Sequence, residues 1–352
     1  MSQRHIISTM VMLAALYVLL LPATAAHATP INLQRVSVAF DGAPANNGSN
    51  FPSLSADGRY IVFESYASNL VLGDTNNAAD IFVTDLTTGE IERVSVNAEG
   101  VEANRGAHFP SLSADGRYVA FQSASDNLVP DDNNGFEDIF LYDRQTGAIK
   151  RIDAFSENEA NESNGYSYFP SISADGRYVA FHSSATNLVV GDTNDVIDVF
   201  VYDNVLDTLR RVSVASDGSQ ANGFSNAPSI SSDGRFIAFH SDANNLVPGD
   251  NNNLIDVFVY DQQTASIERI SRAHDGGPAN SASTIPGISA DGRYVVFQSD
   301  ANNLVPGDTN GKGDIFVYDR TAQMMERISL TSGGLQANGI SYLGYHDVIS
   351  HD

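Results

Sequence analysis

One short segment that returns five times constrains this sequence more than any other feature. Its first copy reads Ser-Ala-Asp-Gly-Arg-Tyr, and the residues between copies repeat as well. The copies are separated by 58, 60, 58 and 58 residues and are centred on Asp57, Asp115, Asp175, Asp233 and Asp291. A fixed period of this length predicts repeated supersecondary units that stack on one another.

One unit, residues 52–97, predicts four short strands. Residues 52–55 and 60–63 flank an Asp-Gly pair, which is a strong hairpin signal. A long polar loop leads to a third apolar run at 81–83, and Thr-Thr-Gly precedes a fourth run at 91–96. Four antiparallel strands per unit without helical periodicity predict an all-β fold, a β-propeller of four-stranded blades.

The consensus of the repeat supports this interpretation. Pro-Ser-apolar-Ser-Ala-Asp-Gly-Arg-Tyr-Val-Ala-Phe is clearest at 110–121 and 170–181. It resembles the WD40-like (PD40-type) repeat of TolB-like β-propellers. The resemblance covers nearly the whole chain after its N-terminal segment. It implies a six-bladed TolB-like architecture and binding as a class of function, without a particular partner.

The ends of the repeat region decide the number of blades. Full blades start near residues 52, 110, 170, 228 and 286. Residues 31–38 match a fourth strand, and the chain from residue 338 matches the start of another blade. We therefore expect five full blades plus strands of an incomplete sixth, the alternative being a closed five-bladed ring.

Composition and the N-terminus indicate where such a protein works. Residues 1–28 combine Arg4, an apolar stretch and small residues, which predicts a secretory signal peptide. We expect residues 29–352 to form the propeller, to be exported to the periplasm or outside the cell, and to have no membrane span after signal removal. The net charge of −24 argues against nucleic acid as a partner. With no cysteine in the chain, disulfides are excluded.

A second motif, Asp-x-Asn-x-x-x-Asp, lies in a long loop of every unit and is the candidate metal site. Two carboxylates and an amide oxygen at this spacing suit Ca²⁺. The alternative is turn chemistry, because the fifth loop position never supplies an oxygen ligand and is Ala78, Phe136, Val196, Leu254 or Lys312. The five sets are Asp74, Asn76 and Asp80; Asp132, Asn134 and Asp138; Asp192, Asn194 and Asp198; Asp250, Asn252 and Asp256; and Asp308, Asn310 and Asp314.

Each unit also offers an arginine and an aspartate for an internal ion pair. Arg59 begins the second strand and Asp85 ends the antiparallel third strand, so both lie at the end of the short turns. We predict an Arg–Asp contact in every blade that fixes the strand register.

The candidate ligand-binding residues lie at the end of each second strand, between a constant Phe and a constant Ser. Buried polar groups need partners, so these side chains meet either internal hydrogen bonds or a ligand. They are Glu64, Gln122, His182, His240 and Gln298.

The function that these features favour is binding. The links after strands two and four are long and polar and share one face of the propeller, where a protein or small ligand would bind. No Gly-x-Ser-x-Gly elbow is present. We therefore expect an exported, non-catalytic scaffold, stabilised by calcium. The alternative is a carbohydrate-active enzyme, a glycoside hydrolase or lyase, built on a propeller.

Overall fold

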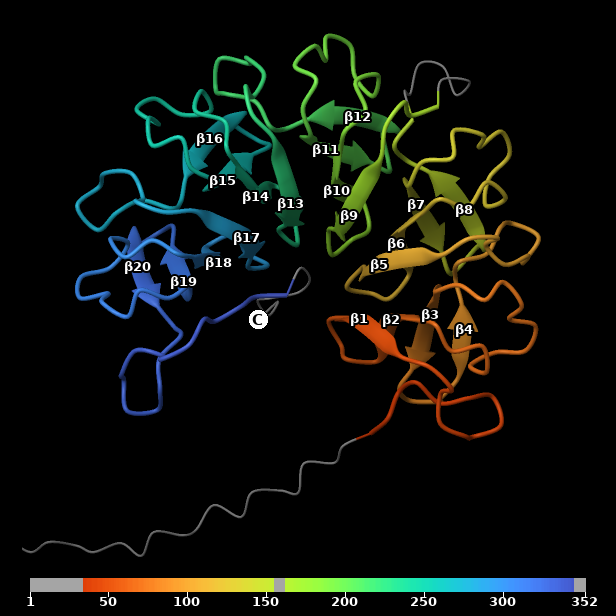
Figure 1. The fold of residues 1–352 in the computed structure, drawn as a ribbon. Coiled ribbons are helices and arrows are strands. Elements are labelled where there is room, and N and C mark those ends of the chain that lie inside the picture. Colours follow the sequence, from red (N-terminus) through yellow and green to blue (C-terminus); the bar gives the residue numbers. More distant parts are fainter. Residues whose placement is uncertain (1–33, 155–161, 345–352) are drawn as a thin grey trace, which may run out of the picture. The chain divides into compact units, whose positions relative to one another are not determined.

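The computed structural model describes residues 34–154 and 162–344, which contain twenty strands and no helix (Figure 1). The strands form five four-stranded antiparallel sheets, each a meander in chain order. The all-β propeller of four-stranded blades is therefore confirmed. The predicted signal peptide lies outside the described residues, and within them no helix is long and apolar enough to cross a membrane.

The five sheets have strands at matching positions of the repeat. The first strands are β1 (Ser49–Leu54), β5 (Ala107–Leu112), β9 (Ser167–Ile172), β13 (Ser225–Ile230) and β17 (Ser283–Ile288). The second strands are β2 (Tyr60–Ser65), β6 (Tyr118–Ser123), β10 (Tyr178–Ser183), β14 (Phe236–Ser241) and β18 (Tyr294–Ser299). The third strands are β3 (Asp80–Asp85), β7 (Asp138–Asp143), β11 (Asp198–Asp203), β15 (Asp256–Asp261) and β19 (Asp314–Asp319). The fourth strands are β4 (Ile91–Arg93), β8 (Ala148–Arg151), β12 (Thr208–Arg211), β16 (Ser266–Arg269) and β20 (Met324–Arg327).

The repeated Asp-Gly pair builds the turn between the first two strands of each sheet. In the first sheet, Asp57 accepts hydrogen bonds from the Ser55 hydroxyl at 2.6 Å and from the Arg59 backbone N–H at 2.9 Å. Gly58 has φ of 67°, a conformation that favours glycine. The turn thus needs Ser, Asp and Gly at these positions, which is why the segment recurs in every unit.

The hydrophobic core lies between successive sheets. One face of the first sheet, including Val62 and Val83, packs against the opposite face of the second, including Val119 and Phe121. The same layering recurs at the next three sheet pairs. Each layer removes branched and aromatic side chains from water, which is the main stabilising term for such a stack.

A ladder of backbone hydrogen bonds joins the short turns of successive sheets. The Ala56 N–H donates to the Ala114 carbonyl at 2.9 Å, and Ala114 donates in turn to Ala174. The ladder continues from Ala174 to Ser232 and from Ser232 to Ala290, at 3.0 Å each. Every step runs in the same direction along the chain.

The outer faces of the first and fifth sheets are less buried than the faces between sheets. Leu54 is 49% exposed, whereas its equivalents in the other four sheets are 5–8% exposed. Ile328 is 50% exposed, whereas its four equivalents are at most 2% exposed. Within the described residues, no extensive strand contact joins the fifth sheet to the first.

Short segments at both ends of the described chain follow the repeat without completing a sheet. Val38 bridges to Pro44 as Val96 bridges to Glu102 after the first sheet. Ser341 donates its backbone N–H to Gly313 at 2.9 Å, just as the first residue of β17 donates to Ile255. These are the contacts expected of parts of a sixth blade.

The predicted Arg–Asp contact is confirmed in all five sheets. Each arginine also lies over the ring of the following residue, for example at 4.8 Å from the Tyr60 centroid for Arg59. The pairs and their N···O distances are Arg59–Asp85 (2.7 Å), Arg117–Asp143 (2.7 Å), Arg177–Asp203 (2.9 Å), Arg235–Asp261 (2.7 Å) and Arg293–Asp319 (2.6 Å).

Candidate functional site

The two carboxylates of each Asp-x-Asn-x-x-x-Asp loop surround a buried arginine of the fourth strand. The Arg211 guanidinium lies 2.8 Å from Asp192 and 3.2 Å from Asp198. Corresponding ion pairs form around Arg93, Arg151, Arg269 and Arg327. Sequence reasoning assigned no partner to these arginines. A signal was present, because in every unit the arginine is followed by an apolar residue and then by Ser or Asp.

The asparagine of each loop uses both ends of its amide within the protein. The Asn76 side-chain NH₂ donates to Asp80 at 3.1 Å, and its Oδ1 accepts from the Ala78 backbone N–H at 2.8 Å. The same two bonds form at Asn134, Asn194, Asn252 and Asn310. The structure thus contains the Asx-type turn that the sequence offered as the alternative to a metal site.

The first loop and the segment after β4 together bring three carboxylates close enough for a metal ion. Asp74, Asp80 and Glu102 place carboxylate oxygens within 4.8 Å of one another, the only such group among the described residues. Burial raises the pKa of Asp80 to about 6. The Arg93 guanidinium contacts all three carboxylates, at 3.8, 3.4 and 2.6 Å, and already balances part of their charge. A bound Ca²⁺ would have to displace or share this contact.

The five predicted ligand-binding side chains all lie at equivalent positions and accept a hydrogen bond from the next unit. In four of the pairs the donor is the third residue of the following first strand, where the register shifts and φ is positive, as at Phe109 with φ of 51°. Such a bulge turns the backbone N–H away from its own ladder. In the fifth pair the donor is Leu343, which lies outside the strands. The pairs are Glu64–Phe109 (3.4 Å), Gln122–Phe169 (3.0 Å), His182–Ala227 (3.4 Å), His240–Ile285 (3.3 Å) and Gln298–Leu343 (3.4 Å).

The two histidines of this set are neutral at ordinary pH. Burial lowers the pKa of His182 to about 3 and that of His240 to about 4. Their Nδ1 atoms accept hydrogen bonds, which a neutral imidazole does and an imidazolium does not. These side chains therefore link blades, and ligand binding by them stays a prediction.

A group of side chains near Glu64 breaks the repeat. His108 lies with its Nδ1 3.3 Å from the Glu64 carboxylate, and the hydrogen bond to Glu64 raises the pKa of His108. Glu137 lies close enough to His108 for their charges to interact. Sequence reasoning missed both residues, although each stands where the other four units have different residues.

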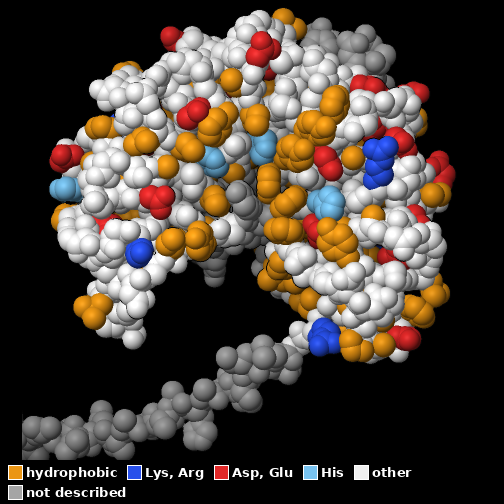
Figure 2. Space-filling model, in the orientation of Figure 1, with side chains coloured by type: hydrophobic (Ala, Val, Ile, Leu, Met, Phe, Trp, Pro, Cys, Tyr) orange, Lys and Arg blue, Asp and Glu red, His pale blue; other side chains and the backbone are white. Residues whose placement is uncertain are grey.

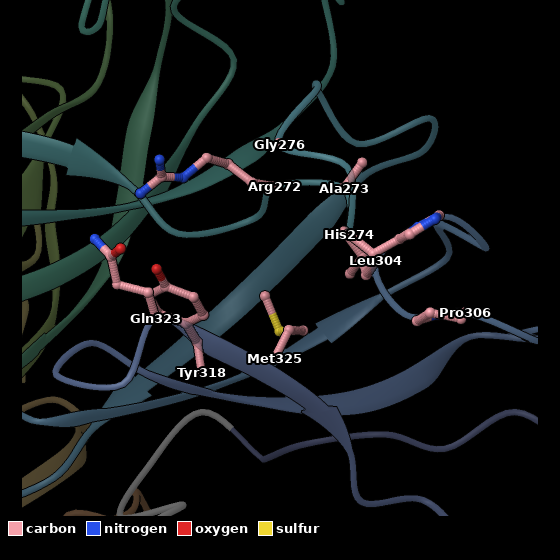
Figure 3. Close-up of a pocket in the computed structure, with 9 residues that line it drawn as sticks. All are labelled: Arg272, Ala273, His274, Gly276, Leu304, Pro306, Tyr318, Gln323 and Met325. Atoms are coloured by element: carbon pink, nitrogen blue, oxygen red, sulfur yellow. The ribbon is translucent and has the colours of Figure 1, made fainter.

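A separate hollow lies between the segment after the fourth sheet and the fifth sheet. Its volume is about 290 Å³. Figure 3 shows Leu304, Tyr318 and Met325 below the loop that carries Arg272 and Ala273. Its lining is mixed, because Arg272, His274 and Gln323 stand beside these less polar side chains.

Comparisons with known proteins agree with the repeat and the sheets. No family model matches the chain. A segment of 101 residues is 32% identical to the Tol-Pal system protein TolB of Francisella tularensis subsp. tularensis and covers 29% of this chain and 19% of that protein. The fold of this chain is that of a TolB-like β-propeller.

Solved structures similar to the chain include two TolB proteins. TolB from Acinetobacter baumannii has a TM-score of 0.45 and 18% identity, over 79% of this chain and 53% of that chain. A putative TolB from Agrobacterium tumefaciens has a TM-score of 0.48 and 17% identity, over 80% of each chain. A manganese-bound oligogalacturonate lyase has a TM-score of 0.46 and 14% identity, over 81% of this chain and 65% of that chain.

Proposed function

We propose that the protein is an exported, non-catalytic propeller that binds a protein or small ligand on the face formed by its long loops. The observation that carries this proposal is the gathering of non-repeated side chains there. Tyr66, His108 and Glu137 each differ from their equivalents in the other units. Residues that the scaffold does not require at every blade are available for recognition.

Placing a photo-crosslinking residue on each face tests this function. At position 66 on the long-loop face, we expect discrete crosslinked adducts in the cell envelope of an expressing cell. At Gln145, an exposed residue of a short turn, we expect none. Adducts from both faces alike, or from the short-turn face only, would argue against the proposal.

Calcium binding is a separable part of the proposal. The support for it is the set formed by Asp74 and Asp80 of the first loop with Glu102 of the segment after β4. Oxygen ligands of this kind suit Ca²⁺, and an ion bound to the native state stabilises it by mass action. We expect the melting temperature of residues 29–352 to rise between EDTA and millimolar calcium, and to rise less for Glu102→Gln. An unchanged melting temperature would mean that all five loops are Asx-type turns that bind no calcium.

The alternative function, a carbohydrate-active enzyme, is favoured by one observation. Glu64 and Glu137 are two carboxylates near one histidine, and burial raises the pKa of Glu137. A protonated and an ionised carboxyl are the parts that glycoside hydrolysis uses. Incubation with polysaccharides, followed by chromatography of the products, tests this alternative. New oligosaccharides that the Glu137→Gln variant does not produce would show that the protein is a catalyst.

A further inference from the structure

The long-loop ends of the first three sheets carry a set of acidic and aromatic side chains that occurs once in the chain. The equivalents of Glu64 are Gln or His, and those of Glu137 are Ala, Ile or Gly. Figure 2 shows histidine, acidic and hydrophobic side chains gathered near β5, β9 and β13. We name these residues the acidic aromatic cluster: Glu64, Tyr66, His108, Glu137, Tyr166 and Tyr168.

The charge in the cluster is incompletely balanced. Glu64 is buried and meets His108, but the Glu137 Oε2 atom is buried without a hydrogen-bond partner. A buried oxygen without a hydrogen-bond partner destabilises the folded protein. Arg105 lies near enough for its charge to act on Glu137, but its guanidinium is directed to Asp126 at 3.9 Å. Glu137 as a whole is only half-buried, so a positively charged donor from outside the chain can reach its carboxylate.

Aromatic rings lie beside the charged groups of the cluster. Tyr168 is close enough to Glu137 for their charges to interact. The Tyr166 and Tyr168 rings are stacked, with centroids 5.9 Å apart and an angle of 9° between their planes. The Tyr66 ring lies 6.4 Å from the ring of His108, which contacts Glu64. Tyr66 is 47% exposed and Tyr166 is 44% exposed, so ring surface is open to a ligand. Ring faces attract ammonium and guanidinium groups.

The spacing of the acidic groups argues for an organic cation instead of a metal ion. Glu64, His108 and Glu137 do not form a group with ligand atoms within 4.8 Å of one another, whereas Asp74, Asp80 and Glu102 do. A single ion therefore does not reach the three groups. A larger cation with N–H donors and an apolar part spans both carboxylate and rings.

We propose that the acidic aromatic cluster binds a small organic cation, with its ammonium or guanidinium group at Glu137 and its apolar part against Tyr66 and Tyr166. This inference rests on the proposed binding function and names the ligand chemistry of the long-loop face. The high negative charge of the chain also raises the local concentration of such cations at low salt.

Calorimetric titration of residues 29–352 tests the proposal. The probes are N-acetylagmatine, which has one guanidinium, its neutral urea counterpart, and N-acetylputrescine, which has one primary ammonium. We expect saturable binding of one molecule of at least one cation and no binding of the urea. If neither cation binds at millimolar concentration, or the urea binds equally well, the proposal is wrong.

Three variants locate the site. Glu137→Gln keeps the side-chain shape and should weaken cation binding about tenfold or more, the value of a charge-assisted hydrogen bond. Arg105→Gly introduces the residue of the third and fourth units, removes a competing cation and should tighten binding. Asp300→Asn changes a carboxylate at the position equivalent to Tyr66 in the fifth unit and should leave binding unchanged.

The variants also separate this proposal from the function on which it rests. Equal affinity of Glu137→Gln and the unchanged protein, with its melting temperature preserved, would overturn the cation site. Crosslinking from position 66 that persists when no cation binds would keep the long-loop face as a binding face and reject only the ligand chemistry. Loss of both would reject both.

Discussion

Asp153 occupies a position where the other four units have serine. In those units the serine hydroxyl donates to the third-strand aspartate, as Ser213 donates to Asp198 and Ser271 to Asp256. An aspartate at this position places two buried carboxyls together. Burial raises the pKa of both Asp153 and Asp138, and the charge of Asp153 raises that of Asp138 further. The pair therefore retains a proton in the folded protein.

Replacing this aspartate should stabilise the protein. The unfolded chain releases the proton near pH 3.8 and the folded chain holds it to higher pH, so the free energy of unfolding falls as pH rises above 3.8. In EDTA, we expect Asp153→Ser to raise that free energy by about 1–3 kcal/mol at pH 8 and by little at pH 4. Denaturant unfolding across this range measures it. The reverse change, Ser213→Asp, should have the opposite effect; a pH-independent difference would contradict the shared proton.

At the scale of the element, the bulge in each first strand determines which residue types can stand at the end of the second strand in the preceding sheet. The displaced N–H needs an acceptor, and Glu, Gln and neutral His all supply one. The sequence predicted the strands and the polar position because apolar alternation and turn residues are local signals. It did not identify the acceptor role, since the bulge lies one blade away and no local pattern marks it.

Two substitutions of His182 distinguish the contribution of its hydrogen bond from that of its ring packing. His182→Gln keeps an acceptor and copies Gln122 and Gln298, so we expect a small effect on unfolding free energy at pH 8. His182→Ala leaves the Ala227 N–H unpaired and should cost about 1–3 kcal/mol. Denaturant melts measure both. Equal losses would show that the ring packing, and not the hydrogen bond, is required.

His182 also makes the free energy of unfolding depend on pH. Because burial lowers the pKa of His182 from 6.5 to about 3, only the unfolded chain takes up the proton between these values. The free energy of unfolding therefore falls as pH drops below 6.5. We expect His182→Gln to lose less stability than the unchanged protein between pH 7 and pH 4. Parallel pH profiles would contradict a neutral buried imidazole.

At the scale of the molecule, the sheets differ in how many of their faces are covered. The second, third and fourth sheets have a neighbour on both sides, whereas Leu54 and Ile328 lie on faces with less cover. The sequence predicted five full units flanked by fragments of a sixth, from the matches at 31–38 and after 338. The number of exposed faces was not predictable, because face-to-face packing depends on contacts between units.

Hydrogen exchange should follow this difference. Local opening is easier where fewer apolar contacts must be broken. We expect peptides from β10 and β11 to exchange more slowly than those from β2 and β3 or from β18 and β19, as measured by mass spectrometry. Equal protection in all five sheets would mean that the outer faces are covered in solution. Repeating the measurement at several protein concentrations would show whether a second copy covers them.

The directional ladder between the short turns has a consequence for how the gene can change. Each of the four turns from Ala56 to Ser232 meets its successor through the same backbone atoms, so a duplicated unit would make the same contacts with both of its neighbours. In-frame gain or loss of about one repeat is therefore the large mutation that this scaffold tolerates best. A change of a few codons inside a strand would misalign that strand with the adjoining sheets, whereas a loop accommodates it, as the 60-residue spacing before Asp175 shows.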